Sequence, residues 1–342
     1  MFHRLTIAAV AAAVLSVTTG EAVAQAPATT SASCVLSAQD GDWTRQALEG
    51  WGRVNESRLQ IAPVTLPTLV LFDQACTHVF RPAADSVAPG TFRAAGHAFE
   101  VASSSHSGQI AIPGGDAFPV GLTSFAAPGA EGRMFFVMSL PSLWRAKAVA
   151  SNTDMLATVV FVHEFTHTQS ASLGARVDAL IARGLPAEAD DDVIQTRFGD
   201  RPGFKAAYEA ERDLLFRAAT ASSLEESRKD AAAALRSIER RRRTYFAGAD
   251  AIFAEAEAIF LTMEGIAQWA AYAWLIDPSG GSMAPADALP FLRRGGKRWS
   301  QDEGLALLLV LDRLSPGWPA KLLAPEPINA IELAEGMVSG KR

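Results

Sequence analysis

The chain contains the apolar stretch Val159-Val160-Phe161-Val162-His163-Glu164-Phe165-Thr166-His167. A helix turns through about 100° per residue, so His163 and His167, four positions apart, lie on the same face. Thr153 and Asp154 supply a helix start, and Gly174 supplies a plausible stop. The sequence therefore predicts a buried helix of about five turns that carries two histidines and a glutamate among apolar residues.

The spacing of the two histidines suits a shared metal ion. Neutral imidazole is a good ligand for zinc, and two imidazoles four residues apart on a helix can bind the same ion. Glu164 lies just off that face, where it can reach a water molecule at the ion without being a ligand. The alternative interpretation is a buried helix in which both histidines are ordinary core residues.

The residues His163, Glu164 and His167 form an H-E-x-x-H pattern, which resembles the motif of the zincin metallopeptidases. The resemblance implies that both histidines bind Zn²⁺, that Glu164 is the general base, and that the substrate is a peptide or protein. It also implies that a strand shortly before the helix forms the edge of the substrate cleft. Here that strand would be residues 134–140, and an interior strand is the alternative.

A third ligand is needed, because catalytic zinc sites normally combine three protein ligands with one water. After His167 the chain has no further histidine or cysteine, so a downstream ligand must be a carboxylate. The longer metzincin motif is absent, since Ser170 and Leu173 stand where its glycine and third histidine would be. The competing acids are Asp190, Asp191, Asp192, Glu209, Glu211, Glu255, Glu257 and Glu264.

Glu264 is the preferred third ligand. It lies in the apolar run 260–269, where an unpaired carboxylate would lose its hydration without compensation. Gly265 allows another helix to approach closely, and Gln268 is expected to hydrogen-bond the free nitrogen of a ligating histidine. Glu257, seven residues earlier on the same face, is the second choice. A structural ion pair between Glu264 and an arginine is the alternative.

The segment around Glu264 also resembles the E-G-x-A-x-aromatic helix of gluzincin-like peptidases, in which the glutamate is the third zinc ligand. In this chain the aromatic residue, Trp269, stands at a shifted spacing. The resemblance thus implies a zinc site made of His163, His167 and Glu264.

Composition and charge narrow the classes of function. The chain has 342 residues, 49% of them hydrophobic, and a net charge of −6, which does not suggest a general affinity for nucleic acid. The basic run 240–243 lies among glutamates and is interpreted as a solvated helix face. The sequence contains no G-x-S-x-G elbow, no glycine-rich phosphate loop and no S-x-x-K motif.

Residues 1–24 are predicted to be a signal peptide. Arg4 precedes an apolar run from residue 5 to about residue 17, and Ala22-Val23-Ala24 provides a cleavage site after Ala24. No other stretch is expected to span a membrane. The mature protein is therefore expected to be periplasmic or secreted, and in such a compartment Cys34 and Cys76 are expected to form a disulfide.

The rest of the chain divides by pattern into two regions, which predict an α+β fold, and the resemblance to the zincins implies that this fold is zincin-like. Residues 25–150 form a small, mostly β N-terminal region with an edge strand, packed on a mostly helical zinc-binding region of residues 151–342. The expected strands are 67–73, 98–102, 109–112, 120–125 and 133–140, after a helix over 42–58. Beyond the histidine helix, helices are expected over 175–183, 203–221, 224–246, 249–275, 301–314 and 328–337.

These observations favour zinc-dependent hydrolysis of peptide bonds. The residue that would stabilise the oxyanion stays open among Tyr208, Tyr245, Tyr272, His78, His97 and His106. The alternative is an exported zincin-fold protein without proteolytic activity that acts as a binding or scaffold module. Hydrolysis of a non-peptide amide would use the same site.

Overall fold

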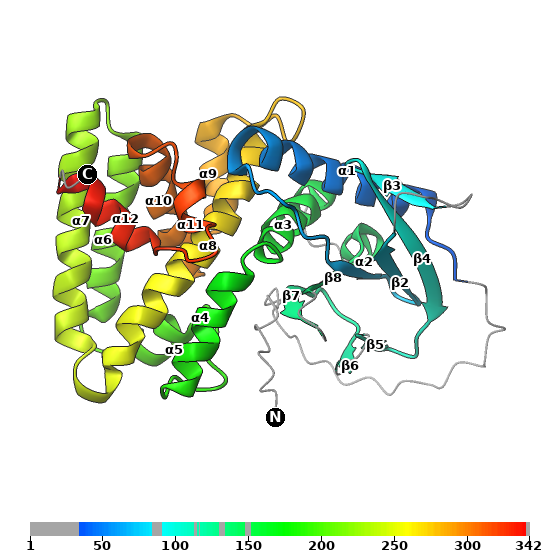
Figure 1. Cartoon of the computed structure of the whole chain (residues 1–342), viewed down its shortest axis with the longest axis horizontal. Helices are drawn as coiled ribbons and strands as arrows, with labels where there is room; N and C mark the ends of the chain where they lie inside the picture. The colour runs from blue at the N-terminus through cyan, green and yellow to red at the C-terminus, as the bar shows by residue number, and fades with distance from the viewer. Residues whose placement is uncertain are drawn as a thin grey trace. The chain divides into compact units, whose positions relative to one another are not determined.

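The computed structural model describes residues 34–83, 91–112, 115, 117–129, 134–147 and 152–339 (Figure 1). The predicted signal peptide lies outside these residues. They form two compact units: a sheet unit of residues 34–49 and 66–161, and a helical unit of residues 50–65 and 162–339. The fold is α+β, with a mixed sheet in the N-terminal half and helices in the C-terminal half.

The sheet unit contains a six-stranded sheet in the order β3-β4-β2-β1-β8-β7. β1 and β8 are parallel, and the other neighbours are antiparallel. The strands are β1 (Thr68–Phe72), β2 (Cys76–Pro82), β3 (Phe92–Ala94), β4 (His97–Ser105), β7 (Ser124–Pro128) and β8 (Met134–Ser139), with β5 (Gln109–Ala111) and β6 (Ala117–Pro119) as a separate pair.

β8 is an interior strand, so the edge strand predicted over residues 134–140 is wrong. It pairs with β1 on one side and with β7 on the other. Pairing between strands far apart in the sequence decides which strand lies at an edge, and the local pattern of β8 does not contain that information. The helix α2 (Pro141–Ala146) follows β8, and the histidine helix comes after it.

A helix and a disulfide complete the sheet unit. The predicted helix over residues 42–58 is α1 (Ala38–Val54), continued by η1 (Asn55–Leu59), and residues 38–49 of α1 belong to this unit. Cys34 and Cys76 form the predicted disulfide, which closes a loop of 42 residues. On the chain-entropy argument, a loop of this size stabilises the fold by about 4 kcal/mol.

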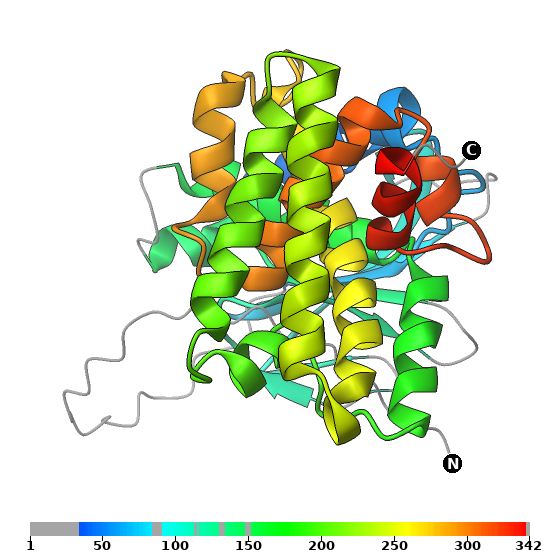
Figure 2. The ribbon, with the colours of Figure 1, turned by 90° about the vertical axis from the view of Figure 1, so that its left-hand side faces the viewer.

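The helical unit contains most of the described helices. The long antiparallel helices α6 and α7 lie side by side, as Figures 1 and 2 both show. The helices are α3 (Thr153–His167), whose residues 162–167 belong to this unit, α4 (Ala171–Ala182), α5 (Val193–Phe198), α6 (Phe204–Thr220), α7 (Leu224–Tyr245), η3 (Gly248–Ala251), α8 (Ile252–Ile276), α9 (Pro285–Arg293), α10 (Trp299–Leu314), α11 (Pro319–Leu322) and α12 (Ala330–Val338).

The histidine helix α3 ends at His167 and not at Gly174. Three successive backbone bonds of the i→i+3 type tighten the chain here, donated by the amides of Thr168, Gln169 and Ser170. Such bonds close the last turn of a helix, and α4 begins as a separate helix at Ala171. Gly174 lies inside α4, so the predicted stop is seven residues too late.

The helix α8 lies in the core of the helical unit. Residues Gly248–Ile276 are long and apolar enough to cross a membrane by length and composition, but 89% of their most apolar window is buried by protein. α8 crosses α10 where two glycines meet, since a methyl group added to Gly265 would lie 2.7 Å from the carbonyl oxygen of Gly304. This close crossing is the one that the glycine beside Glu264 predicts.

Candidate metal centre

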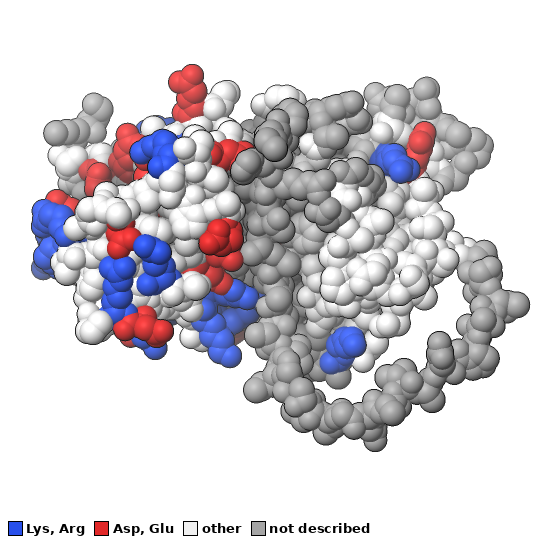
Figure 3. Space-filling model, turned by 90° about the horizontal axis from the view of Figure 1, so that it is seen from below, with Lys and Arg blue, Asp and Glu red and all other residues white. Residues whose placement is uncertain are grey.

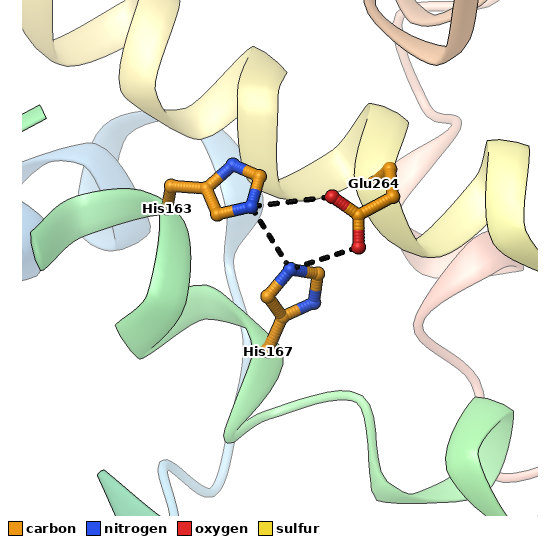
Figure 4. Close-up of side chains that lie close together, drawn as sticks. All are labelled: His163, His167 and Glu264. Atoms are coloured by element: carbon orange, nitrogen blue, oxygen red, sulfur yellow. Dashed lines mark hydrogen bonds and ion pairs between the residues drawn. The ribbon is translucent and has the colours of Figure 1, made fainter. Parts of the chain in front are cut away.

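His163, His167 and Glu264 come together in the helical unit as a buried group. The Nε2 atoms of the two histidines, both on α3, lie 3.1 Å apart. The carboxylate of Glu264 on α8 points toward both rings, 3.3 Å from Nε2 of His163 and 3.2 Å from Nε2 of His167 (Figure 4). All three side chains are at most 8% exposed.

These distances fit a shared metal ion. With metal–ligand bonds of about 2.0–2.1 Å in a tetrahedral arrangement, neighbouring ligand atoms lie about 3.3 Å apart. The observed separations of 3.1–3.3 Å match this spacing. Moreover, Oε2 of Glu264 is buried and accepts no hydrogen bond from the described residues. A buried carboxylate oxygen in that condition is costly unless a cation compensates it, so the group could hold a metal ion.

Without a metal, the two imidazoles stabilise the charged form of Glu264, and this carboxylate stabilises the charged form of His167. Burial alone would raise the pKa of Glu264, but the two imidazoles outweigh burial and hold that pKa well below its usual range. Burial alone would lower the pKa of His167, but the carboxylate of Glu264 outweighs it and raises this pKa to about 9. At neutral pH the metal-free centre therefore contains an ionised carboxylate and a protonated His167, and a metal ion would replace that proton.

Glu164 lies between the two histidines in the sequence and is 4% exposed. It is not a member of the group whose ligand atoms converge. Its charge nevertheless acts on His167, whose pKa it helps to raise. The structure thus places Glu164 close to the centre but outside the set of ligand atoms.

Glu257, the second choice for the third ligand, belongs to a separate buried ion-pair cluster. Its Oε1 accepts a hydrogen bond of 2.8 Å from Arg241, and its Oε2 accepts one of 2.7 Å from Arg242. Arg241 also pairs with Glu211 and is 2% exposed. The expectation that residues 240–243 form a solvated face is therefore wrong for Arg241, because buried carboxylates on α6 and α8 draw it into the core.

Two other acids that competed for the ligand position are paired at the surface. Glu255 accepts a hydrogen bond of 2.9 Å from Arg183. Oε1 of Glu209 lies 3.9 Å from Nζ of Lys205, one turn earlier on α6. Figure 3 shows one face of the surface, on which basic and acidic side chains lie intermingled in this manner.

Two of the three aspartates 190–192, Asp191 and Asp192, lie within electrostatic range of the centre. Burial, followed by the charge of Glu264, raises the pKa of Asp191 to about 9. Asp192 forms an ion pair with Arg298, in the loop before α10. Asp191 is thus protonated at neutral pH in the metal-free protein, and Asp192 is neutralised by its partner.

Gln268 does not have the partner that the sequence predicts for it. Its side-chain amide donates to Oε1 of Gln301 on α10 at 2.9 Å. Nδ1 of His163 is buried and has no hydrogen-bond partner among the described residues. The helix α10 packs along α8 and turns the amide of Gln268 toward itself, which the sequence of α8 alone could not indicate.

The six candidates for an oxyanion-stabilising residue remain without an assigned role. The hydroxyl of Tyr208 donates to the carbonyl oxygen of Trp299, and that of Tyr245 donates to the carbonyl oxygen of Pro202. Burial raises the pKa of Tyr272. The three histidines His78, His97 and His106 belong to the sheet unit.

Comparisons of the chain with known protein families, with characterised proteins and with solved structures found no match. The candidate centre is therefore defined by its own geometry. It is a buried group of two histidines and one glutamate, held by α3 and α8, that could hold a metal ion.

Proposed function

We propose that the protein is a zinc-dependent hydrolase of peptide bonds with a zincin-like fold. The observation that supports this most strongly is the approach of Glu264 to within 3.3 Å of both imidazoles, 97 and 101 positions along the chain. Two imidazoles and a carboxylate form a donor set typical of catalytic zinc. Zinc bound by this group would lower the pKa of a coordinated water toward 7 and polarise a carbonyl group.

The proposal gives each side chain of the site a separate role. His163, His167 and Glu264 would hold the ion, and all three side chains are buried. Glu164 accepts a proton from the attacking water as the water oxygen bonds to the carbonyl carbon. Glu164 then gives that proton to the nitrogen of the leaving amine, and the peptide bond breaks.

We propose further that the protein is exported, to the periplasm or the medium, after cleavage of residues 1–24. The disulfide between Cys34 and Cys76 supports this proposal, because such bonds persist in oxidising compartments. The N-terminal sequence pattern supports it independently.

The variant Glu164→Gln tests the proposal, with Glu239→Gln on the exposed face of α7 as its control. The account predicts one zinc per chain in both variants. It also predicts that hydrolysis of a general protein substrate falls by about 10²–10⁴-fold only in Glu164→Gln. A chelator should stop hydrolysis by the wild type, and added zinc should restore it.

Two results would contradict the proposal. An unchanged rate in Glu164→Gln would remove this residue from the role of general base. A wild-type protein that binds one zinc per chain and hydrolyses none of the peptides, proteins or simple amides offered would instead favour a binding or scaffold module.

A further inference from the structure

The loop between α9 and α10 has the sequence Arg293-Arg294-Gly295-Gly296-Lys297-Arg298-Trp299. Two of its arginines are held by ion pairs: Nε of Arg293 lies 2.7 Å from Asp302, and Arg298 pairs with Asp192. Arg294 stands between them and has neither a hydrogen bond nor an ion pair with any of the described residues. The loop is therefore fixed on both sides of a guanidinium group that no carboxylate of the described residues binds.

Two contacts place the start of α10, where this loop ends, beside the part of α8 that carries Glu264. The start of α10 is fastened to α8 by the hydrogen bond from Gln268 to Gln301, one turn beyond Glu264. Next to Glu264 the two helices nearly touch, at Gly265 and Gly304. The loop ends where α10 begins, so this close helix crossing fixes the C-terminal end of the loop relative to α8.

The backbone of the loop is unusual at Arg294. Its φ is 46°, and the following Gly295 and Gly296 have φ of 75° and 68°. Glycine adopts such values freely, whereas an arginine in the left-handed region is disfavoured and persists only where its surroundings impose it. The loop thus holds Arg294 in a defined conformation although its side chain is exposed to solvent.

The charge of Arg294 is coupled to the catalytic region. Surrounding protein removes water from its guanidinium group and, with Arg298, lowers its pKa, while the carboxylate of Glu164 acts in the opposite direction. Arg294 and Glu164 therefore lie within electrostatic range of each other. A cation that is accessible, partly desolvated and unpaired is well suited to bind an anion supplied by a ligand.

We propose that Arg294 binds a carboxylate group of the substrate next to the bond that is cleaved. This inference rests on the proposed function and adds a substrate class to it: peptides that carry a carboxylate near the scissile bond. The planar guanidinium group can donate two parallel hydrogen bonds to a carboxylate, which a lysine cannot do. The carboxylate is either the C-terminus of a short peptide or the side chain of an acidic residue.

The test uses three short peptides of equal length: N-acetyl-trialanine, its C-terminal amide, and N-acetyl-Ala-Glu-Ala amide. Their hydrolysis is measured with the zinc-loaded wild type and with Arg294→Gln, Arg294→Lys and Lys297→Gln. Lys297 is the matched control, because it is an exposed cation of the same loop for which no ion pair is found among the described residues.

The account predicts that Arg294→Gln lowers kcat/KM by about 10- to 100-fold for peptides with a carboxylate and leaves the neutral amide unchanged. Arg294→Lys should recover part of the loss, and Lys297→Gln should behave as the wild type. Loss for N-acetyl-trialanine alone would assign the C-terminus as the group that is bound, and loss for the glutamate peptide alone would assign the acidic side chain. Equal loss for all three peptides, or no loss, would overturn the proposal.

A binding measurement separates this proposal from the proposed function. Calorimetric titration of the same peptides into chelator-treated protein requires no turnover. Tighter binding of a carboxylate peptide than of the amide, abolished in Arg294→Gln, would support the role of Arg294 even if no hydrolysis were found. Equal affinity of wild type and Arg294→Gln for all three peptides would overturn it even in an active peptidase.

Discussion

Two buried glutamates on the same helix have different partners. Glu257 and Glu264 are seven residues apart on α8, and they are 3% and 4% exposed. Arg241 and Arg242 donate to both oxygens of Glu257. Glu264 faces two imidazoles instead, and one of its oxygens accepts no hydrogen bond from the described residues. Similar positions in the sequence thus lead to two different kinds of charge compensation.

The difference lies in the chemistry of the partners. A guanidinium group stays protonated at any physiological pH, so the two arginines compensate the charge of Glu257 permanently. Imidazole loses its proton more readily and is then a metal ligand. The cluster at Glu264 can therefore exchange a proton for a metal ion, whereas the cluster at Glu257 can only stabilise or destabilise the fold.

The largest expected effect comes from breaking the arginine cluster. Arg241→Met leaves Glu211 without its cation in the core and removes one of the two cations of Glu257. The free energy of unfolding should fall by about 3–5 kcal/mol, as measured by urea denaturation of the metal-free protein. The zinc affinity of the folded fraction should not change. Arg243→Met, which breaks only the exposed pair with Glu239, should cost less than about 1 kcal/mol.

Exchanging the two glutamates for glutamine gives the next largest effect and compares the sites directly. Glu264→Gln should weaken zinc binding by more than about 100-fold. Mutation of a residue that only hydrogen-bonds to a metal ligand already lowers metal affinity by about 10- to 100-fold. Glu257→Gln should leave zinc affinity unchanged and reduce stability. Competition with a chromogenic chelator measures the first quantity and urea denaturation the second. Equal zinc affinities in the two variants would contradict the distinction.

A methyl group at the crossing of α8 and α10 should move α8 and so disturb the group around Glu264. Gly265→Ala would place the new carbon 2.5 Å from Cδ2 of Leu308 and 2.7 Å from the oxygen of Gly304. Because the added methyl group pushes α8 away from α10, the variant should lose about 1–3 kcal/mol of stability and bind zinc more weakly. Gly174→Ala, also within a helix and with open space around the new carbon, should be neutral or slightly stabilising. Thermal unfolding with and without zinc measures both effects.

The smallest predicted effect is the dependence of zinc binding on pH. Since the pKa of His167 is about 9 without metal, zinc binding at pH 7 should release about one proton from this residue. Affinity should rise about tenfold per pH unit and level off near pH 9. In the metal-free protein the stabilisation from protonated His167 is complete below pH 6.5 and is lost as the pH rises through about 9. Calorimetry in buffers of different ionisation enthalpy counts the protons.

The sequence predicts the buried group of His163, His167 and Glu264 well because its signals are local. The spacing of His163 and His167 needs only helical geometry, and Glu264 is conspicuous as a carboxylate in an apolar run with glycine beside it. Helical spacing does not separate Glu264 from Glu257, since both lie on the same face of α8, and the preference for Glu264 comes from the residues around it. Their partners come from α3 and α7, so the partner of Glu257 is visible only in the tertiary structure.

The features that the sequence does not reveal depend on contacts between distant segments. Arg294 occurs in a run of basic and glycine residues that is typical of a surface loop, and its relation to Glu164 depends on how α10 packs on α8. The helix α9 lies in a segment rich in glycine and proline, although Pro285 at its first turn is a known start signal. The strand β2 carries the buried polar side chains Thr77 and His78, which hide its pattern.

X-ray absorption at the zinc edge, on protein loaded with one equivalent of zinc, identifies the atoms that bind the ion. The account predicts a shell of nitrogen and oxygen ligands at about 2.0–2.1 Å that includes two imidazole rings, and loss of one oxygen ligand from this shell in Glu264→Gln. Zinc that binds without imidazole, or a shell that is the same in Glu264→Gln as in the wild type, would contradict it.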